Sequence, residues 1–232
     1  MKKFIILFVI LVFPTAFYIF LSYGVERYRR TPVFGPRQAI EITGTDGKKK
    51  TDTSYFKIPA FEAKRCEGGN FSLSAYQGRM YVTAFLHPDS SKNGYNMGPL
   101  LTEYKIKKGE YRRISFLFFW PSDSSSAAPA PDLAAQLKIS KDSALIICLP
   151  KQQYDSLRSA TYFISDPARQ KEPFTQKMYD LVLVDKEGKI RGYYNGRYPG
   201  KVKELKEDIR HILQHDEAEE TTRQTKIEQK QK

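Results

Sequence analysis

The chain has 232 residues, 41% of them hydrophobic and 13% aromatic, and a formal net charge of +12. This length suits a membrane anchor plus one domain of roughly 150–180 residues, and the composition is that of a globular protein rather than a disordered one. The positive charge is spread along the chain and no nucleic-acid-binding motif accompanies it, which argues against nucleic acid as a partner. A basic surface near anionic lipid or an acidic protein is the simpler interpretation.

Residues 4–23, FIILFVILVFPTAFYIFLSY, carry no charged side chain and approach the ~20 residues that cross a bilayer. Lys2 and Lys3 precede this run and favour a cytoplasmic N-terminus, although the arginines that follow it weaken the argument. A cleaved signal peptide is the alternative, but its apolar region would be shorter and a small-x-small site would follow it. We therefore expect residues 1–30 to be an uncleaved, single-pass anchor with a basic flank. The folded domain would then lie on the extracytoplasmic side of the cytoplasmic (inner) membrane.

Residues 31–54 are rich in Gly, Thr and Lys and are typical of a tether, in which the short apolar run at residues 39–42 allows an edge strand. Residues 55–215 are expected to form the compact domain. Three apolar runs predict strands buried on both faces: residues 80–86 (MYVTAFL), 113–120 (RISFLFFW) and 143–149 (SALIICL). Short helices are expected between and after these strands, at residues 97–106, 133–138 and 151–159.

Residues 178–194, MYDLVLVDKEGKIRGYY, predict a β-hairpin in which Gly188 supplies a positive φ. Asp185 begins the turn, where aspartate commonly binds the following backbone, so we assign it a structural role rather than a catalytic one. An amphipathic helix follows, with apolar residues three and four positions apart: Val202, Leu205, Ile209, Ile212 and Leu213. Residues 216–232 lack such periodicity and are expected to be a disordered charged tail.

The order strand–helix–strand–helix–hairpin–helix predicts an α/β fold: a thioredoxin-like domain with a central mixed sheet flanked by helices. Three stretches carry a more specific signal: IPAF at residues 58–61 with Gly69, Leu73 and Gly78; Met97 after the first buried strand; and LVDKEGKIRGYY at residues 183–194 with Leu205, Asp208, Ile209 and Leu213. Together they resemble the Sco/SenC family over roughly residues 58–213. Members of that family are membrane-anchored thioredoxin-fold proteins that deliver copper during cytochrome c oxidase assembly.

The resemblance implies where the copper ligands of that family would lie. The family uses two cysteines separated by three residues and a histidine, because soft sulfur ligands select Cu(I). Alignment on Met97 puts the cysteine positions at Ser90 and Gly94, and the histidine position falls at Lys177 or an immediate neighbour. None of these residues suits Cu(I), and no thioredoxin-type dithiol or peroxidatic cysteine is left either. We therefore expect no catalytic residue, no metal site and no cofactor.

Three residues are weak substitute ligands, His87, Met97 and Cys66, so copper is expected only if the site has been rebuilt. His211 and His215 are four apart on the last predicted helix, where they either share a metal or simply favour the helix dipole. Ser90 lacks the nucleophile elbow that a hydrolase would need.

Cys66 and Cys148 are the only cysteines. An even count permits a disulfide in an oxidising compartment, but Cys148 in its apolar strand is equally compatible with a buried free thiol. A catalytic pair is a third reading.

The sequence thus predicts a membrane-anchored, Sco-like binding protein without enzymatic activity, a helper for respiratory-complex assembly. Its expected partners are the membrane and a protein in the membrane or periplasm, and no small-molecule substrate is identified. Two alternatives stay open: a copper carrier with a rebuilt site, and a thiol-disulfide oxidoreductase that uses Cys66 and Cys148.

Overall fold

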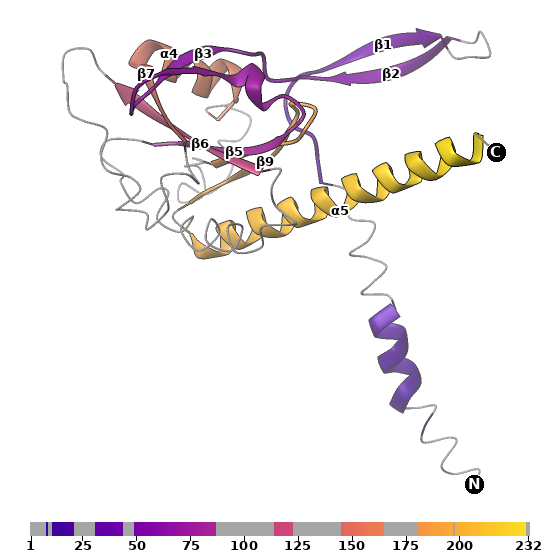
Figure 1. Ribbon diagram of the computed structural model, residues 1–232. Helices are drawn as coiled ribbons and strands as arrows, with labels where there is room; N and C mark the ends of the chain where they lie inside the picture. The colour runs from indigo at the N-terminus through magenta and orange to yellow at the C-terminus, as the bar shows by residue number, and fades with distance from the viewer. Residues whose placement is uncertain are drawn as a thin grey trace. The chain divides into compact units, whose positions relative to one another are not determined.

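The computed structural model describes residues 8, 11–20, 31–43, 49–86, 114–122, 145–164, 181–196 and 198–230, with side chains in the last helix described as far as residue 216 (Figure 1). The chain divides into two units, residues 1–31 and residues 32–232.

In the first unit, residues 11–20 form a helix with exposed side chains. Across the described part of the chain, no helix has both the length and the apolar character needed to cross a membrane. The expected anchor at residues 4–23 extends beyond the described stretch at both ends, so the anchor stays a prediction.

The second unit is built on a seven-stranded sheet with the order β4-β3-β7-β6-β5-β8-β9. Its strands are β3 (Glu62–Arg65), β4 (Asn70–Ser72), β5 (Met80–Phe85), β6 (Ile114–Ser122), β7 (Leu145–Pro150), β8 (Leu181–Val184) and β9 (Ile190–Tyr194). β5, β6 and β7 run parallel, whereas β8 pairs antiparallel with β5, and β9 pairs antiparallel with β8. The N-terminal hairpin β3–β4 joins the sheet through antiparallel pairing of β3 with β7.

This arrangement is thioredoxin-like: a parallel β5–β6 pair, an antiparallel hairpin on the other side of β5, and a terminal helix. The predicted mixed α/β sheet is therefore confirmed. Each of the three apolar runs forms a strand, and β5 is buried along its whole length, as a strand between two covered faces must be.

Alternate residues of β5 point into two different cores. Met80, Val82 and Ala84 belong to the core on the α5 face, whereas Tyr81 and Phe85 belong to the core on the opposite face. On that second face the Phe85 ring makes edge-on contacts with the rings of Phe119, Tyr154 and Tyr162, with centroids 5.0–5.6 Å apart.

Three further helical segments are described. η1 spans Leu73–Tyr76, and α4 (Lys151–Ser156) continues into the π-helical turn Leu157–Thr161, which together match the helix predicted for residues 151–159. The helices predicted at residues 97–106 and 133–138 lie outside the described residues.

The terminal helix α5 runs from Pro199 to Lys230, and its predicted apolar stripe is buried against the sheet. The structure differs here from the expected disordered tail, because residues 216–230 continue the helix. Once a helix is nucleated against a core, each added residue gains a hydrogen bond, and this stretch contains neither Gly nor Pro to end it.

Residues 31–54, expected to be a tether, instead contain a two-stranded antiparallel sheet, β1 (Arg37–Thr43) paired with β2 (Lys49–Tyr55). Backbone hydrogen bonds hold its base: the Phe56 N–H donates to the Pro36 carbonyl (3.1 Å), and the Phe34 N–H donates to the Ile190 carbonyl (2.9 Å). The edge strand allowed at residues 39–42 lies within β1. Its pairing with β2 was not predicted, since the described side chains of both strands are largely exposed.

Candidate functional site

The ligand positions implied by the sequence follow β5 directly. Leu86 is the last described residue of that segment, and its N–H donates to the Phe119 carbonyl at 3.0 Å. His87, Ser90, Gly94, Met97 and Lys177 all lie outside the described residues. Their assignment to the family's ligand positions, or as substitutes for those ligands, therefore stays a prediction.

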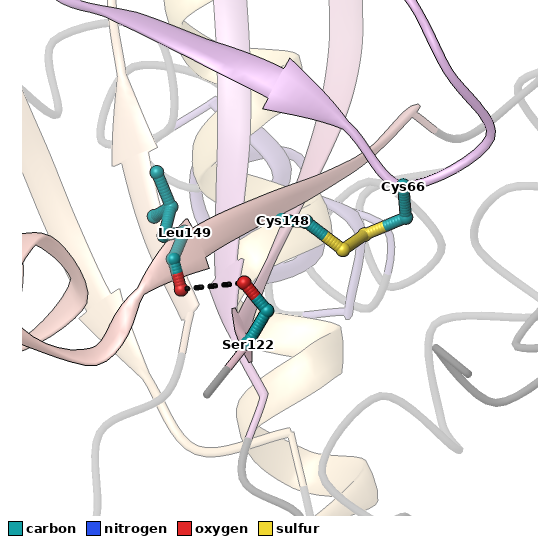
Figure 2. The surroundings of a disulfide bond; sticks show 4 residues. All are labelled: Cys66, Ser122, Cys148 and Leu149. Atoms are coloured by element: carbon teal, nitrogen blue, oxygen red, sulfur yellow. Dashed lines mark hydrogen bonds between the residues drawn. A yellow bond between two sulfur atoms is a disulfide. The ribbon is translucent and has the colours of Figure 1, made fainter. Parts of the chain in front are cut away.

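Cys66 and Cys148 form a disulfide, with their Cα atoms 4.9 Å apart (Figure 2). Cys66 directly follows β3 and Cys148 lies within β7, and the two strands pair antiparallel, with Lys64 opposite Cys148. The Cys66 N–H donates to the Ile146 carbonyl at 3.0 Å, so the bridge joins diagonal neighbours across paired strands. Of the possibilities that the sequence left open, the structure selects the bridge and excludes a buried free thiol at Cys148.

The bridge lies at the carboxyl end of the parallel strands. Phe85 is opposite Phe119, and Trp120 is opposite Cys148, so Cys148 is level with Leu86, where the chain leaves β5. Two interstrand spacings separate β7 from β5, which is about 10 Å. Leu86 and both cysteines contact the same core, on the α5 face. In the sequence, the positions at which the family resemblance places ligands begin shortly after Leu86, which lies at this end of the sheet.

The surroundings of the bridge are only partly covered. Both cysteines are half-buried against the α5-face core, and nearby the Ser122 hydroxyl donates to the Leu149 carbonyl at 3.3 Å (Figure 2). In the bridged form neither sulfur is a thiolate, and the thiolate is both the nucleophile and the soft metal ligand.

A copper site does not fit the donors in the described ranges. Both cysteines are consumed by the bridge, and no three His, Cys, Asp or Glu residues of those ranges lie close enough together to hold a metal ion. His211 and His215 belong to α5, one half-buried and the other exposed, without a described third ligand.

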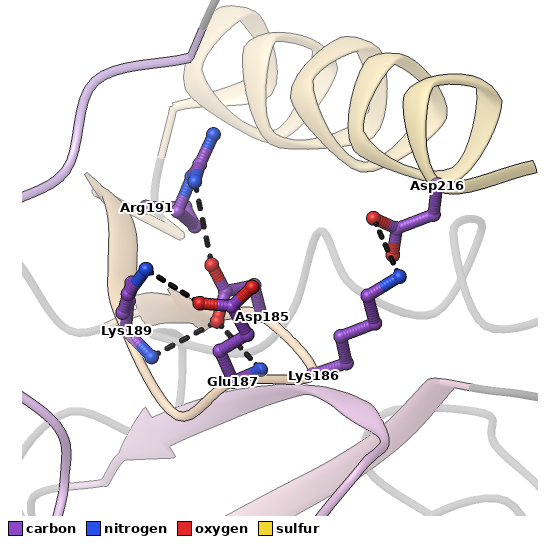
Figure 3. Close-up of polar contacts among 6 residues, drawn as sticks. All are labelled: Asp185, Lys186, Glu187, Lys189, Arg191 and Asp216. Atoms are coloured by element: carbon purple, nitrogen blue, oxygen red, sulfur yellow. Dashed lines mark hydrogen bonds and ion pairs between the residues drawn. The ribbon is translucent and has the colours of Figure 1, made fainter. Parts of the chain in front are cut away.

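The β8–β9 turn is organised around Asp185, a residue that is only 6% exposed (Figure 3). Its Oδ1 accepts the backbone N–H groups of Glu187 and Lys189, both at 2.9 Å, and its Oδ2 accepts a hydrogen bond from Arg191 at 3.3 Å. Gly188 has φ +81°, and its N–H donates to the Asp185 carbonyl at 3.0 Å. The predicted structural role of Asp185 and the predicted positive φ at Gly188 are both confirmed.

The electrostatics of this carboxyl are set mainly by its burial. Burial raises the pKa of Asp185, and the hydrogen bonds from the Lys189 and Glu187 backbone, together with the charge of Arg191, only partly oppose that rise. Its neighbour Glu187 behaves oppositely, because the hydrogen bond from the Lys189 side chain lowers the pKa of Glu187.

A cavity of about 370 Å³ opens beside this turn, at the other end of β5 from the disulfide. It is lined by residues of the segment before β3, by η1 and its following turn, by Tyr81 of β5 and by the β8–β9 turn itself. Sequence reasoning missed this cavity because four separate segments contribute to it. Of these four segments, the sequence analysis had singled out the β8–β9 turn, but only as part of a hairpin.

No protein-family model and no curated protein matches the sequence. Among solved structures, the chain is similar to the soluble domain of Sco1 from Bacillus subtilis, with 17% identity, coverage of 68% of this chain and 92% of that chain, and a TM-score of 0.41. It is also similar to a SCO1/SenC family lipoprotein from Bacillus anthracis str. Ames, with 19% identity, coverage of 66% and 93%, and a TM-score of 0.44.

A third match is a putative thiol:disulfide interchange protein DsbE from Chlorobium tepidum, with 17% identity, coverage of 69% of this chain and 99% of that chain, and a TM-score of 0.46. Sco/SenC proteins are thus among the solved structures that this chain resembles, as its sequence led us to expect.

Proposed function

We propose that this protein is a non-catalytic binding protein with a Sco-like thioredoxin fold, which assists the assembly of respiratory complexes such as cytochrome oxidase. It is anchored in the cytoplasmic membrane by residues 4–23, with its folded domain on the extracytoplasmic side, and it binds a protein partner in the membrane or periplasm. The observation that carries the proposal is the cross-strand bridge between Cys66 and Cys148, which takes up both thiols of the chain.

Copper delivery depends on thiolate ligands, and the bridged chain has no free thiol. The residues that sequence alignment places at the ligand positions, Ser90, Gly94 and Lys177, offer a hydroxyl, no side chain and a cation. A thioredoxin-like domain without these ligand groups is better suited to binding a partner protein than to transferring copper.

The bridge also supports the proposed location. Disulfides persist in oxidising compartments and are rare where thiol reductants are abundant. This one joins the N-terminal hairpin to β7 across 82 sequence positions, as a disulfide that stabilises the fold would. A domain outside the cytoplasm, tethered by an apolar N-terminal segment, accounts for both features.

The first test is a competitive Cu(I) titration of the full chain in mild detergent, once with the disulfide intact and once after reduction. We expect the protein to bind copper more weakly than an ordinary chelator in both states. The Cys66→Ser/Cys148→Ser double variant is the control for sulfur ligation. Tight one-to-one binding that is lost in His87→Ala would contradict the proposal and establish a rebuilt copper site.

The second test addresses the partner. Crosslinking of the tagged full chain in native membranes, followed by identification of the adducts, should recover subunits or assembly factors of a respiratory complex. The comparison is the same experiment with the Cys66→Ser/Cys148→Ser variant, which should retain the partner if the thiols are not used. Recovery of the same partner only as a reducible mixed disulfide would contradict a non-catalytic role.

One observation favours a second candidate, a thiol-disulfide oxidoreductase. The bridge is half-buried rather than enclosed, and it lies level with Leu86 at the end of the sheet where β5 ends. In that function a partner dithiol would be oxidised to a disulfide, and its two electrons and two protons would reduce the bridge to two thiols.

Equilibration of the full chain in glutathione buffers, with alkylation of free thiols and mass measurement, separates the two candidates. A structural bridge should stay closed, because structural disulfides resist the glutathione pool. A bridge that opens and closes within the glutathione range, together with catalysed reduction of insulin, would establish the oxidoreductase instead.

A further inference from the structure

The cavity beside the β8–β9 turn has the size of a small-molecule site. Its volume of about 370 Å³ lies near the lower end of the range for such sites, roughly 300–1,000 Å³. Ile58, Ala60 and Leu73 contribute apolar surface, and Tyr76 and Tyr81 contribute aromatic rings. Leu73 and Tyr81 belong to the core opposite α5, so this wall is anchored in the fold.

The walls are held in place before any ligand binds. The Ile58 N–H donates to the Gly188 carbonyl at 2.9 Å, which ties the segment before β3 to the β8–β9 turn. The turn is closed in addition by the Asp185 carboxylate, through its hydrogen bonds to Glu187 and Lys189. A preformed site of this kind loses little conformational freedom on binding.

Four charged side chains line the cavity: Lys57, Asp185, Lys186 and Glu187. Three of them already have close partners: Asp185 pairs with Arg191 at 3.3 Å, Lys186 pairs with Asp216 of α5 at 3.0 Å, and Glu187 pairs with Lys189 (Figure 3).

Lys57 is the exception, since no ion pair within 4.0 Å involves it in the described part of the chain. It is exposed at the cavity, and its charge contributes to the low pKa of Glu187 after the larger effect of the Lys189 hydrogen bond. Lys57 is therefore the cation at this cavity that is left to receive an anionic group.

Tyr81 adds a hydrogen-bond donor. Burial raises the pKa of Tyr81 well above its usual value, so the phenol stays protonated at neutral pH and can donate. Behind it lies Tyr162, fully buried, whose hydroxyl makes no hydrogen bond of ordinary geometry. A neutral donor and a free cation at one cavity are complementary to a carboxylate.

We propose that this cavity binds a small organic acid with an apolar or aromatic body. Its carboxylate pairs with Lys57 and accepts a hydrogen bond from Tyr81, and its body lies against the Leu73 and Tyr76 surface. This goes beyond the proposed assembly role, because it does not depend on the protein partner or on the cysteines.

The test uses three probes of one shape and different charge: 3-phenylpropionate, the neutral 3-phenylpropanol and the cationic 3-phenylpropylamine. Each is titrated by calorimetry into the full chain in mild detergent, with the detergent blank subtracted. We expect the carboxylate to bind about tenfold more tightly than either of the other probes.

Four variants locate the binding. Lys57→Met should abolish the preference for the carboxylate, and Lys57→Arg should retain it. Lys64→Met is the matched control, because Lys64 is also exposed and lies on β3 outside the cavity, so its removal should leave the preference intact. Tyr81→Phe should weaken carboxylate binding without affecting the alcohol to the same degree.

Equal affinities for the three probes would overturn the proposal, as would the absence of saturable carboxylate binding. A carboxylate preference that persists in Lys57→Met would overturn it as well. None of these results bears on copper binding or partner crosslinking, so the cavity and the assembly role fail separately.

Discussion

The two ends of β5 are held by different means. At its carboxyl end a covalent bridge joins the N-terminal hairpin to β7, level with Leu86. At its amino end, about 17 Å away at the usual rise per residue, the β8–β9 turn is held by hydrogen bonds to Asp185. The first end is where the resemblance puts chemistry, and its thiols are consumed. The second end carries no expected chemistry, yet it has a preformed cavity with a free cation.

Among the described residues, the two sulfur atoms at one end of β5 are joined to each other, whereas side chains at the other end line a cavity. A disulfide stabilises mainly by restricting the unfolded chain, and its atoms are then unavailable for other bonds. A turn held by backbone hydrogen bonds leaves neighbouring side chains such as Lys57 free. Four measurements test how strongly each end is held.

The largest effect is expected at the covalent end. Cys66→Ala/Cys148→Ala should lower the free energy of unfolding by about 2–4 kcal/mol, because the unfolded chain regains the freedom of a long loop. Urea titration of the full chain measures it, and reduced wild-type protein should match the variant. A decrease in the free energy of unfolding below about 0.5 kcal/mol, against the ~2 kcal/mol lower bound of that range, would show that the bridge does not stabilise the fold.

The next effect concerns β9 itself. A Cβ at Gly192 would collide with the ring and hydroxyl of Tyr194, whose hydroxyl donates to Asp208 of α5 at 2.6 Å. Gly192→Ala should therefore cost about 1–3 kcal/mol, as overpacking does. Gly200→Ala is the control, since nothing lies within 4 Å of a Cβ there. Thermal unfolding that gives both variants the same midpoint would contradict the described packing of Tyr194.

The third measurement is the pH dependence of the turn. Burial raises the folded-state pKa of Asp185, so the native state holds this proton more tightly than the unfolded state does. The contribution of Asp185 to stability should therefore grow as pH falls from neutral toward its unfolded pKa of about 3.9, and shrink as pH rises through the folded pKa.

Glu187 provides the opposite sign in the same turn. The Lys189 hydrogen bond lowers the pKa of Glu187, so its contribution is present above the unfolded pKa and is lost as pH falls through the folded pKa. Urea unfolding of Asp185→Asn and Glu187→Gln beside wild type, from pH 7 to pH 4, should show the two differences moving in opposite directions. If the two stability differences changed with pH in the same direction, the pKa shifts assigned to Asp185 and Glu187 would be wrong.

The smallest effect is expected for the link between the turn and α5. Lys186 and Asp216 form an ion pair at 3.0 Å, with side chains 32% and 19% exposed. A double-mutant cycle with Lys186→Met and Asp216→Asn should give a coupling of about 0.5 kcal/mol, reduced at high salt. A coupling indistinguishable from zero at low salt would mean that the pair does not hold α5 to the turn.

Much of this fold could be predicted from local sequence patterns. The apolar runs predicted β5, β6 and β7 because strands covered on both faces require continuous apolar sequence. Gly188 and Asp185 were assigned correctly because a turn's chemistry is carried by neighbouring residues. The stripe on α5 was equally local, since it depends only on helical spacing.

Features that depend on which strands pair could not be predicted from local sequence patterns. Whether Cys66 meets Cys148 depends on the pairing of β3 with β7, and no short stretch of sequence encodes that pairing. The pairing of β1 with β2 was missed for the same reason. An edge strand was allowed at residues 39–42, within β1, but the exposed β2 has no buried face to mark it.

The sequence by itself determined the class of fold, the buried strands and the closing hairpin. Only the tertiary structure decided that the cysteines are bridged, that this bridge is level with the end of β5, and that Lys57 and Tyr81 line one cavity. The physical reason is distance along the chain. Periodicity and turn chemistry act between near neighbours, whereas a bridge and a binding cavity are made by residues that only the folded sheet brings together.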